Sequence, residues 1–287
     1  MGGNPDAGDP GPRVAPLRHV RPEQRRAGRS DGIGSGAGTG CPVVTKLPSS
    51  SEPRPAGEPL GCDTSDLIQV HRILRWLYRE LPGLVRDVDD GDVDRADVVA
   101  DYASMDFFAL HLHHETEDVV LWDRLVERSP GCAPHVELMR TQHAQVAAEL
   151  REVEPLVEPW RASADAATRD RLADGVERVR DTLVGHLGRE EDEILPVAGS
   201  VLTQSEWDEM GEHARTGIQE ARKELPRDVM AIQFGLMIAT IPEDERPAWM
   251  KQNLPAPVRL LYTLLLKRRH ERAMDELYDG RPVPPIP

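Results

Sequence analysis

The chain has 287 residues and a formal net charge of −15, with 30% charged and only 4% aromatic residues. This acidic balance argues against a nucleic-acid-binding protein, which normally carries a basic surface. Few aromatics beside many Leu, Val and Ala favour helices over sheets. No apolar stretch approaches the roughly 20 residues of a membrane span, and the N-terminus lacks the apolar core of a signal peptide. We therefore expect a cytoplasmic protein without a transmembrane segment.

Three cysteines, Cys41, Cys62 and Cys132, are far apart in the sequence and odd in number. Their spacing indicates neither a disulfide framework nor a thiolate metal site, which agrees with a reducing compartment. Residues 1–60 are rich in Gly, Pro, Ser and Arg and show no periodicity. We expect a disordered tail there, with an electrostatic docking arm as the weaker alternative.

From Asp63 onwards, apolar periodicity predicts four long helices with short connections. Their approximate bounds are 63–81, 95–127, 134–153 and 166–195. Proline should end or separate them, because it removes a backbone donor and clashes with the preceding turn; the prolines concerned are Pro82, Pro130, Pro155, Pro159 and Pro196. This layout predicts an all-α protein with an antiparallel up-down-up-down four-helix bundle over residues 63–196.

Residues 205–280 predict a C-terminal helical extension, with helices near 205–224, 228–240 and 257–277. The last of these reads PVRLLYTLLLKRRHER, which is apolar and then basic. We expect this helix to pack on the bundle with its basic end in water. A membrane surface or a partner protein is the alternative for such a sequence.

Each of the four bundle helices carries one histidine on its apolar face: His71, His113, His143 and His186. Two of them are followed four residues later by a glutamate, Glu117 and Glu190, and residues four apart share a helix face. Glutamate is rarely buried unless it is paired or ligates a metal.

A single core histidine is more often hydrogen-bonded than metal-bound. One histidine on each of four helices, with two H-x-x-x-E pairs, is a different case, because four imidazoles and two carboxylates in one core need a cation. Mixed histidine and carboxylate donors suit iron or manganese better than zinc, and each carboxylate could bridge two metals.

Four segments of the chain resemble the haemerythrin-like (HHE cation-binding) family: VHRILR, HLHHETEDVVLW, RTQHAQV and HLGREEDEILP. The resemblance covers about residues 63–196, and the remainder to about 278 is similar to an extension of bacterial members. It implies a four-helix bundle that holds a non-haem, carboxylate-bridged pair of irons. The ligands it implies are His71, His113, Glu117, His143, His186 and Glu190.

One difference separates the chain from the oxygen-carrying members, which have a second histidine four residues from the one on the third helix. Here Met139 and Ala147 occupy those positions, which argues against reversible oxygen carriage. His114 lies about 100° around the helix from His113, and it is either a seventh ligand or a supporting group beside the ligands.

The other titratable residues near these motifs receive more ordinary interpretations. We expect His111 not to bind metal. The acids that follow the paired ligands either form a solvated face or bond the ligating imidazoles; they are Asp118, Glu191, Asp192 and Glu193. No role is expected for His19, His135, His213 or His270.

Three functions remain open at this point. The first is a di-iron protein that binds or senses O2, peroxide or nitric oxide, with turnover of peroxide or nitric oxide as a further option. The second is iron storage or iron sensing without catalysis. The third, and the least favoured, is a metal-free helical interaction module. The sequence identifies no protein partner.

Overall fold

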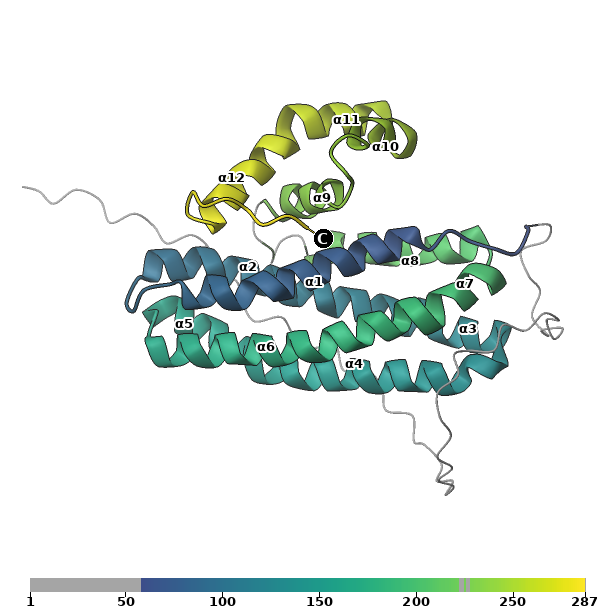
Figure 1. The fold of residues 1–287 in the computed structure, drawn as a ribbon, viewed down its shortest axis with the longest axis horizontal. Helices are drawn as coiled ribbons and strands as arrows, with labels where there is room; N and C mark the ends of the chain where they lie inside the picture. The colour runs from purple at the N-terminus through teal and green to yellow at the C-terminus, as the bar shows by residue number, and fades with distance from the viewer. Residues whose placement is uncertain (1–57, 222–224, 226–227, 287) are drawn as a thin grey trace, which may run out of the picture.

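The computed structural model describes residues 58–221, 225 and 228–286, and every regular element within them is helical. Long antiparallel helices lie side by side in a bundle (Figure 1), which confirms the predicted fold class. The first long helix is α1 (Ser65–Arg86). The second runs from α2 (Val93–Thr116) through a π-helical turn, Glu117–Leu121, into α3 (Trp122–Arg128).

The third and fourth long helices are built in a related way. The third is α4 (Ala133–Val153), which a 3-10 turn at Glu154–Leu156 joins to α5 (Val157–Ser163). The fourth runs from α6 (Ala166–Arg189) through a second π-helical turn, Glu190–Ile194, into α7 (Leu195–Val201).

Two of the long helices begin at an aspartate whose side chain caps the first turn. The carboxylate of Asp92 accepts a hydrogen bond from the backbone N–H of Arg95 at the start of α2 (3.0 Å), and Asp165 accepts one from Thr168 at the start of α6 (2.9 Å). These bonds satisfy amide groups that the first turn of a helix leaves without an intrahelical partner.

Pro82 and Pro196 do not end a helix as predicted, whereas α3 ends at Arg128 just before Pro130 and α4 ends at Val153 just before Pro155. Pro82 lies inside α1, which continues to Arg86 because Leu84 and Val85 are buried and their packing outweighs the local cost of proline. Pro155 and Pro196 lie in the first turns of new helical segments. Proline is tolerated there because its missing N–H would have had no partner anyway.

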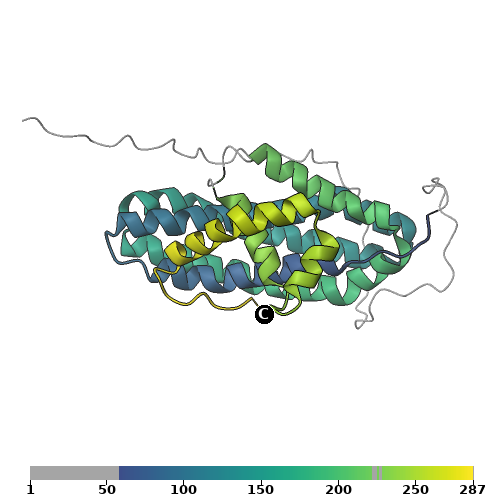
Figure 2. The same ribbon diagram turned by 90° about the horizontal axis from the view of Figure 1, so that it is seen from above.

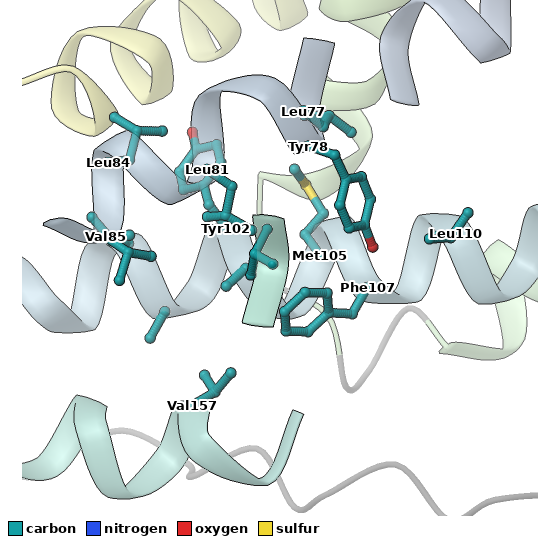
Figure 3. Packing of buried hydrophobic residues seen from close by; sticks show 14 of the residues in the cluster. Leu77, Tyr78, Leu81, Leu84, Val85, Tyr102, Met105, Phe107, Leu110 and Val157 are labelled. Carbon is teal, nitrogen blue, oxygen red and sulfur yellow. The ribbon is translucent and has the colours of Figure 1, made fainter. Parts of the chain in front are cut away.

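The bundle core consists of two hydrophobic clusters with a polar layer between them. Figure 3 shows the larger cluster, where Leu77, Tyr78 and Leu81 of α1 pack near Tyr102 and Met105 of α2. The smaller cluster lies towards the other end of the bundle and includes the buried residues Leu67, Leu121, Trp122, Met139 and Ile194. Burial of these apolar side chains holds the helices around the layer and fixes their register.

The C-terminal extension crosses over one side of the bundle (Figure 2). It comprises α8 (Gln204–Ala221), α9 (Val229–Ala239), α10 (Arg246–Asn253), α11 (Ala256–Leu261), a π-helical turn (Tyr262–Leu266) and α12 (Lys267–Leu277). Helix α9 packs against α1, and α12 packs against α2 and α9. Helix α10 was not predicted from the sequence. The tail expected over 1–60 lies almost entirely outside the described residues.

The predicted packing of the last helix is only partly correct. Ala273, Met274 and Leu277 of α12 are buried against the rest of the protein. Four leucines before it are exposed, however: Leu260 (59%), Leu261 (48%), Leu264 (65%) and Leu265 (42%). None of the helices among the described residues combines the length and apolarity that crossing a bilayer requires.

Candidate metal centre

The six predicted ligands lie in the polar layer between the two hydrophobic clusters. His71 comes from α1, His143 from α4, and the other four come from the C-terminal ends of α2 and α6 and the π-helical turns that follow. All six side chains are buried, and Glu117 and Glu190 are completely inaccessible to solvent. The apolar stripes bring these residues together because each of them replaces one apolar position in the inward face of its helix.

The first group of candidate ligands contains His71, His113, Glu117 and Glu190, whose donor atoms all lie within 4.8 Å of one another. The Nε2 atom of His71 is 3.4 Å from Oε2 of Glu190, and Nδ1 of His113 is 3.3 Å from Oε1 of Glu117. Two imidazoles and two carboxylates therefore face one small volume.

The second group contains Glu117, His143 and His186, again with donor atoms within 4.8 Å of one another. The Nε2 atom of His143 is 3.3 Å from Oε2 of Glu117 and 3.2 Å from Nε2 of His186. Glu117 thus belongs to both groups and offers a different carboxylate oxygen to each. This is the arrangement expected of a carboxylate between two neighbouring metal positions.

His114 lies in the same buried layer. Its ring stacks on the ring of His143, with centroids 4.0 Å apart and 16° between the planes. It also forms a third group of donor atoms with His113 and His186. His114 therefore faces the interior of the bundle beside the predicted ligands.

Hydrogen bonds on the far side of the imidazole rings set their orientation. The Nδ1 atom of His143 lies 2.8 Å from Oδ1 of Asp118, and Nδ1 of His71 lies 2.9 Å from Oε1 of Glu191. His186 Nδ1 lies 3.3 Å from the side-chain oxygen of Gln142. With the proton on Nδ1, each ring keeps its Nε2 lone pair for the centre of the layer, which is the state a metal requires.

Each orienting carboxylate is itself held by a further donor. The indole Nε1 of Trp122 donates to Asp118 (2.9 Å), and the guanidinium of Arg75 donates to Glu191 (2.7 Å). Of the two interpretations that the sequence left open for Asp118 and Glu191, the structure places both as partners of the imidazoles. Asp192 is exposed to solvent.

Both π-helical turns of the bundle begin at a candidate ligand, Glu117 in one case and Glu190 in the other. A π-helical turn adds one residue to the regular helical repeat and often marks a functional position. The sequence contains a weak sign of it, because the buried residues Trp122 and Leu195 follow the two glutamates at a spacing of five.

Burial controls the protonation of the acidic and basic groups in this layer. Burial raises the pKa of Glu190 to about 8, with a further contribution from Glu117, and it raises the pKa of Glu117 as well. Burial and the neighbouring His143 lower the pKa of His186 to about 3. Burial also lowers the pKa of His113 and His114 well below the usual value.

His143 differs from His113, His114 and His186, because its pKa is raised and not lowered. Burial lowers its pKa, but the hydrogen bond with Asp118 and the carboxylate of Glu117 3.3 Å away outweigh that effect and raise it to about 9. A cation that binds here near neutral pH must therefore displace protons from His143 and from Glu190.

Several donor atoms in the layer are buried and have no hydrogen-bond partner among the described residues. They are Nε2 of His71, His113 and His114, together with both carboxylate oxygens of Glu117 and of Glu190. Unsatisfied buried polar atoms are costly, and here seven of them converge. A cation would satisfy them, so the residues present fit a metal centre of mixed nitrogen and oxygen donors.

The remaining histidines lie apart from this layer. His111 bonds Glu154, and His135 bonds Glu193 at 2.8 Å. His213 and His270 belong to the C-terminal extension, on α8 and α12. His19 lies outside the described residues. Cys62 and Cys132 are both free thiols.

Comparison with known proteins agrees with this geometry. A protein-family model described as "Hemerythrin HHE cation binding domain" matches residues 62–198, which include every residue of the layer. No curated protein and no solved structure gives a match. Residues 62–198 of this chain therefore belong to the hemerythrin HHE cation binding domain family.

Proposed function

We propose that the polar layer holds two iron ions and that the protein binds or senses a small oxidant, namely O2, peroxide or nitric oxide. The observation that carries this proposal is the position of Glu117, which offers one oxygen to each of two overlapping groups of buried donors. The mixed donor set favours iron or manganese. The family description supports a cation in general terms.

The two positions divide the candidate ligands between them. His71, His113, Glu117 and Glu190 would hold one ion, and His143, His186 and Glu117 would hold the other. Iron with open coordination positions supplies one-electron chemistry towards diatomic ligands and peroxide. The protein's own part is to fix the donors, to orient the imidazoles through Asp118 and Glu191, and to keep bulk water out of the layer.

The second candidate function is iron storage or iron sensing without turnover. The observation that favours it is the protonation of the layer, since Glu190 and His143 both retain protons near neutral pH and must release them to a cation. Metal occupancy would then depend on pH and on free iron, and it would stabilise the bundle. An oxidant would not need to react.

The first experiment is to load the full chain with ferrous iron under anaerobic conditions and to measure iron per chain. We expect about two irons per chain, as the two groups of donors indicate. A double variant, Glu117→Ala with Glu190→Ala, should bind almost none. If the wild-type protein also binds none, the proposed function is wrong.

The second experiment separates the two functions. The iron-loaded protein is mixed with O2, hydrogen peroxide or nitric oxide in separate samples, and its visible absorption is followed. A rapid change with one of them supports the oxidant proposal. An unchanged spectrum, together with a large rise in thermal stability on iron loading, supports storage or sensing instead.

A further inference from the structure

A cleft lies between the bundle and the C-terminal extension, and none of the candidate metal ligands lines it. Its volume is about 490 Å3. Its walls come from α1, α9, α10 and α12 and from the C-terminal segment, residues 283–286. The indole Nε1 of Trp76 donates to the carbonyl of Pro284 (3.1 Å), and Arg79 donates to Pro285 (3.3 Å), so this segment is tied to α1.

The charges around this cleft are unlike those of the protein as a whole. The chain has 50 acidic residues and a net charge of −15, yet no aspartate or glutamate among the residues that the structure describes lines the cleft. Arg72, Arg246 and His270 do line it. A concave site with basic groups and no acidic group favours an anion.

The basic groups in the cleft have nitrogen atoms that are not fully used in hydrogen bonds or ion pairs among the described residues. Arg72 is exposed and makes no hydrogen bond or ion pair with any of the described side chains. Arg246 donates to the carbonyls of Ile241 (2.8 Å) and Ala239 (3.3 Å), and it has no acidic partner within the part of the chain that the structure describes. The buried Nδ1 atom of His270 has no partner there either.

The rest of the lining is almost entirely apolar. Trp76, Leu236 and Met274 are buried side chains that contribute to the walls, and Ile241, Val283 and Ile286 add further apolar surface. Small-molecule sites commonly combine such walls with a few polar groups, in volumes of roughly 300–1,000 Å3. The cleft has both the size and the composition of such a site.

We propose that this cleft binds a small amphipathic carboxylate, with the carboxylate at the guanidinium groups and the apolar body along Trp76, Ile241 and Met274. A guanidinium can donate two parallel hydrogen bonds to one carboxylate.

The test is calorimetric titration of the full-length protein with decanoate, a ten-carbon carboxylate. Decanol has a comparable chain without the charge, and acetate has the charge without the chain. We expect saturable binding of one decanoate per protein, with decanol and acetate each weaker by about tenfold or more. Acetate also serves as the control for direct ligation of a metal ion, because its carboxylate is the same.

Two variants test the location. Arg72→Gln removes an exposed, unpaired guanidinium from the cleft and should weaken decanoate binding about tenfold. Arg171→Gln removes an exposed guanidinium from α6, away from the cleft, and should leave the binding unchanged. Ala239→Phe, which fills part of the cleft, should weaken decanoate and decanol alike.

The proposal is overturned if decanoate does not bind, if decanol binds as tightly as decanoate, or if Arg72→Gln and Arg171→Gln behave alike. Circular dichroism and the iron content of each variant show whether the fold and the metal centre are intact. These outcomes do not depend on the metal proposal, because the cleft lies outside the polar layer.

Discussion

The Oδ1 atom of Asp118 lies 2.8 Å from Nδ1 of His143, on the edge of the ring opposite the Nε2 atom that faces Glu117. Asp118 directly follows Glu117 in the chain, so one short stretch of the helix supplies both a candidate ligand and the group that orients another. Trp122 in turn donates to Asp118. The orientation of His143 therefore depends on a chain of bonds that begins outside the metal layer.

We predict that Asp118→Ala weakens metal binding by about 10–100-fold, because a ligand imidazole loses the acceptor that fixes its tautomer and its ring plane. Competition with a chelator measures the change. The control is Asp123→Ala, since the Asp123 side chain is 91% exposed and bonds only Arg140 among the described residues. Equal affinities in the two variants would contradict the role of Asp118.

His114 provides a second prediction. Its buried Nε2 atom has no hydrogen-bond partner among the residues described, and Leu187 occupies the corresponding place after His186 on α6. We expect His114→Leu to bind two irons but to lose one of them faster to a chelator. Iron per chain, measured over time, tests this. His111→Leu is the control, and identical loss from both variants and from the wild type would show that His114 is not a ligand.

Asp106 leads to a prediction about pH. Its side chain is buried, Oδ1 has no hydrogen-bond partner in the described part of the chain, and burial raises its pKa well above the usual value. The folded protein therefore keeps a proton that the unfolded chain releases above about pH 4. The free energy of unfolding should fall as the pH rises from there, by up to about 1.4 kcal/mol per pH unit from this group.

Asp106→Asn should remove this contribution, because asparagine resembles the protonated acid in shape. The difference in free energy of unfolding between variant and wild type should grow in favour of the variant between pH 5 and pH 8. Urea unfolding at several pH values measures it. Asp123→Asn should show no such trend, and a constant difference for Asp106→Asn would refute the explanation.

Two glycines give a prediction about packing. A Cβ atom at Gly175 of α6 would lie 2.6 Å from Cγ2 of Val153, whereas one at Gly83 of α1 would meet nothing within 4 Å. Gly175→Ala should lower the free energy of unfolding by about 1–3 kcal/mol through overpacking. Gly83→Ala should raise it by about 0.5–1 kcal/mol, because alanine costs less entropy in a helix. Thermal unfolding of both variants measures the two changes, and a shift of the same sign in both would contradict the prediction.

Much of the fold could be predicted because the apolar stripes are long and regular. The four bundle helices and the inward positions of His71, His113, His143 and His186 follow from the 3.6-residue period alone. Helix ends were harder to predict, since a proline can lie inside a helix or in its first turn as well as just after its end. Pro82 lies inside α1 because the burial of Leu84 and Val85 extends the helix beyond it. That burial depends on tertiary packing, which the local sequence does not show.

Contacts between helices could not be predicted from one sequence. The bond from His71 to Glu191 joins residues 120 positions apart, and the stacking of His114 on His143 depends on how α2 faces α4. The cleft beside Arg72 requires α9, α12 and the C-terminal segment to be placed together. Helix α10 was missed because its short, polar sequence has no clear apolar stripe.

The six candidate ligands are divided equally between two helical hairpins, one formed by α1 with α2–α3 and the other by α4 with α6–α7. His71 of the first hairpin is bonded by Glu191 of the second, and His143 of the second is bonded by Asp118 of the first. Both groups of donor atoms also draw on both hairpins. The two halves are therefore complementary fragments: a chain cut between Arg128 and Ala133 would leave neither piece with a complete donor set, and a bound cation would favour their reassociation.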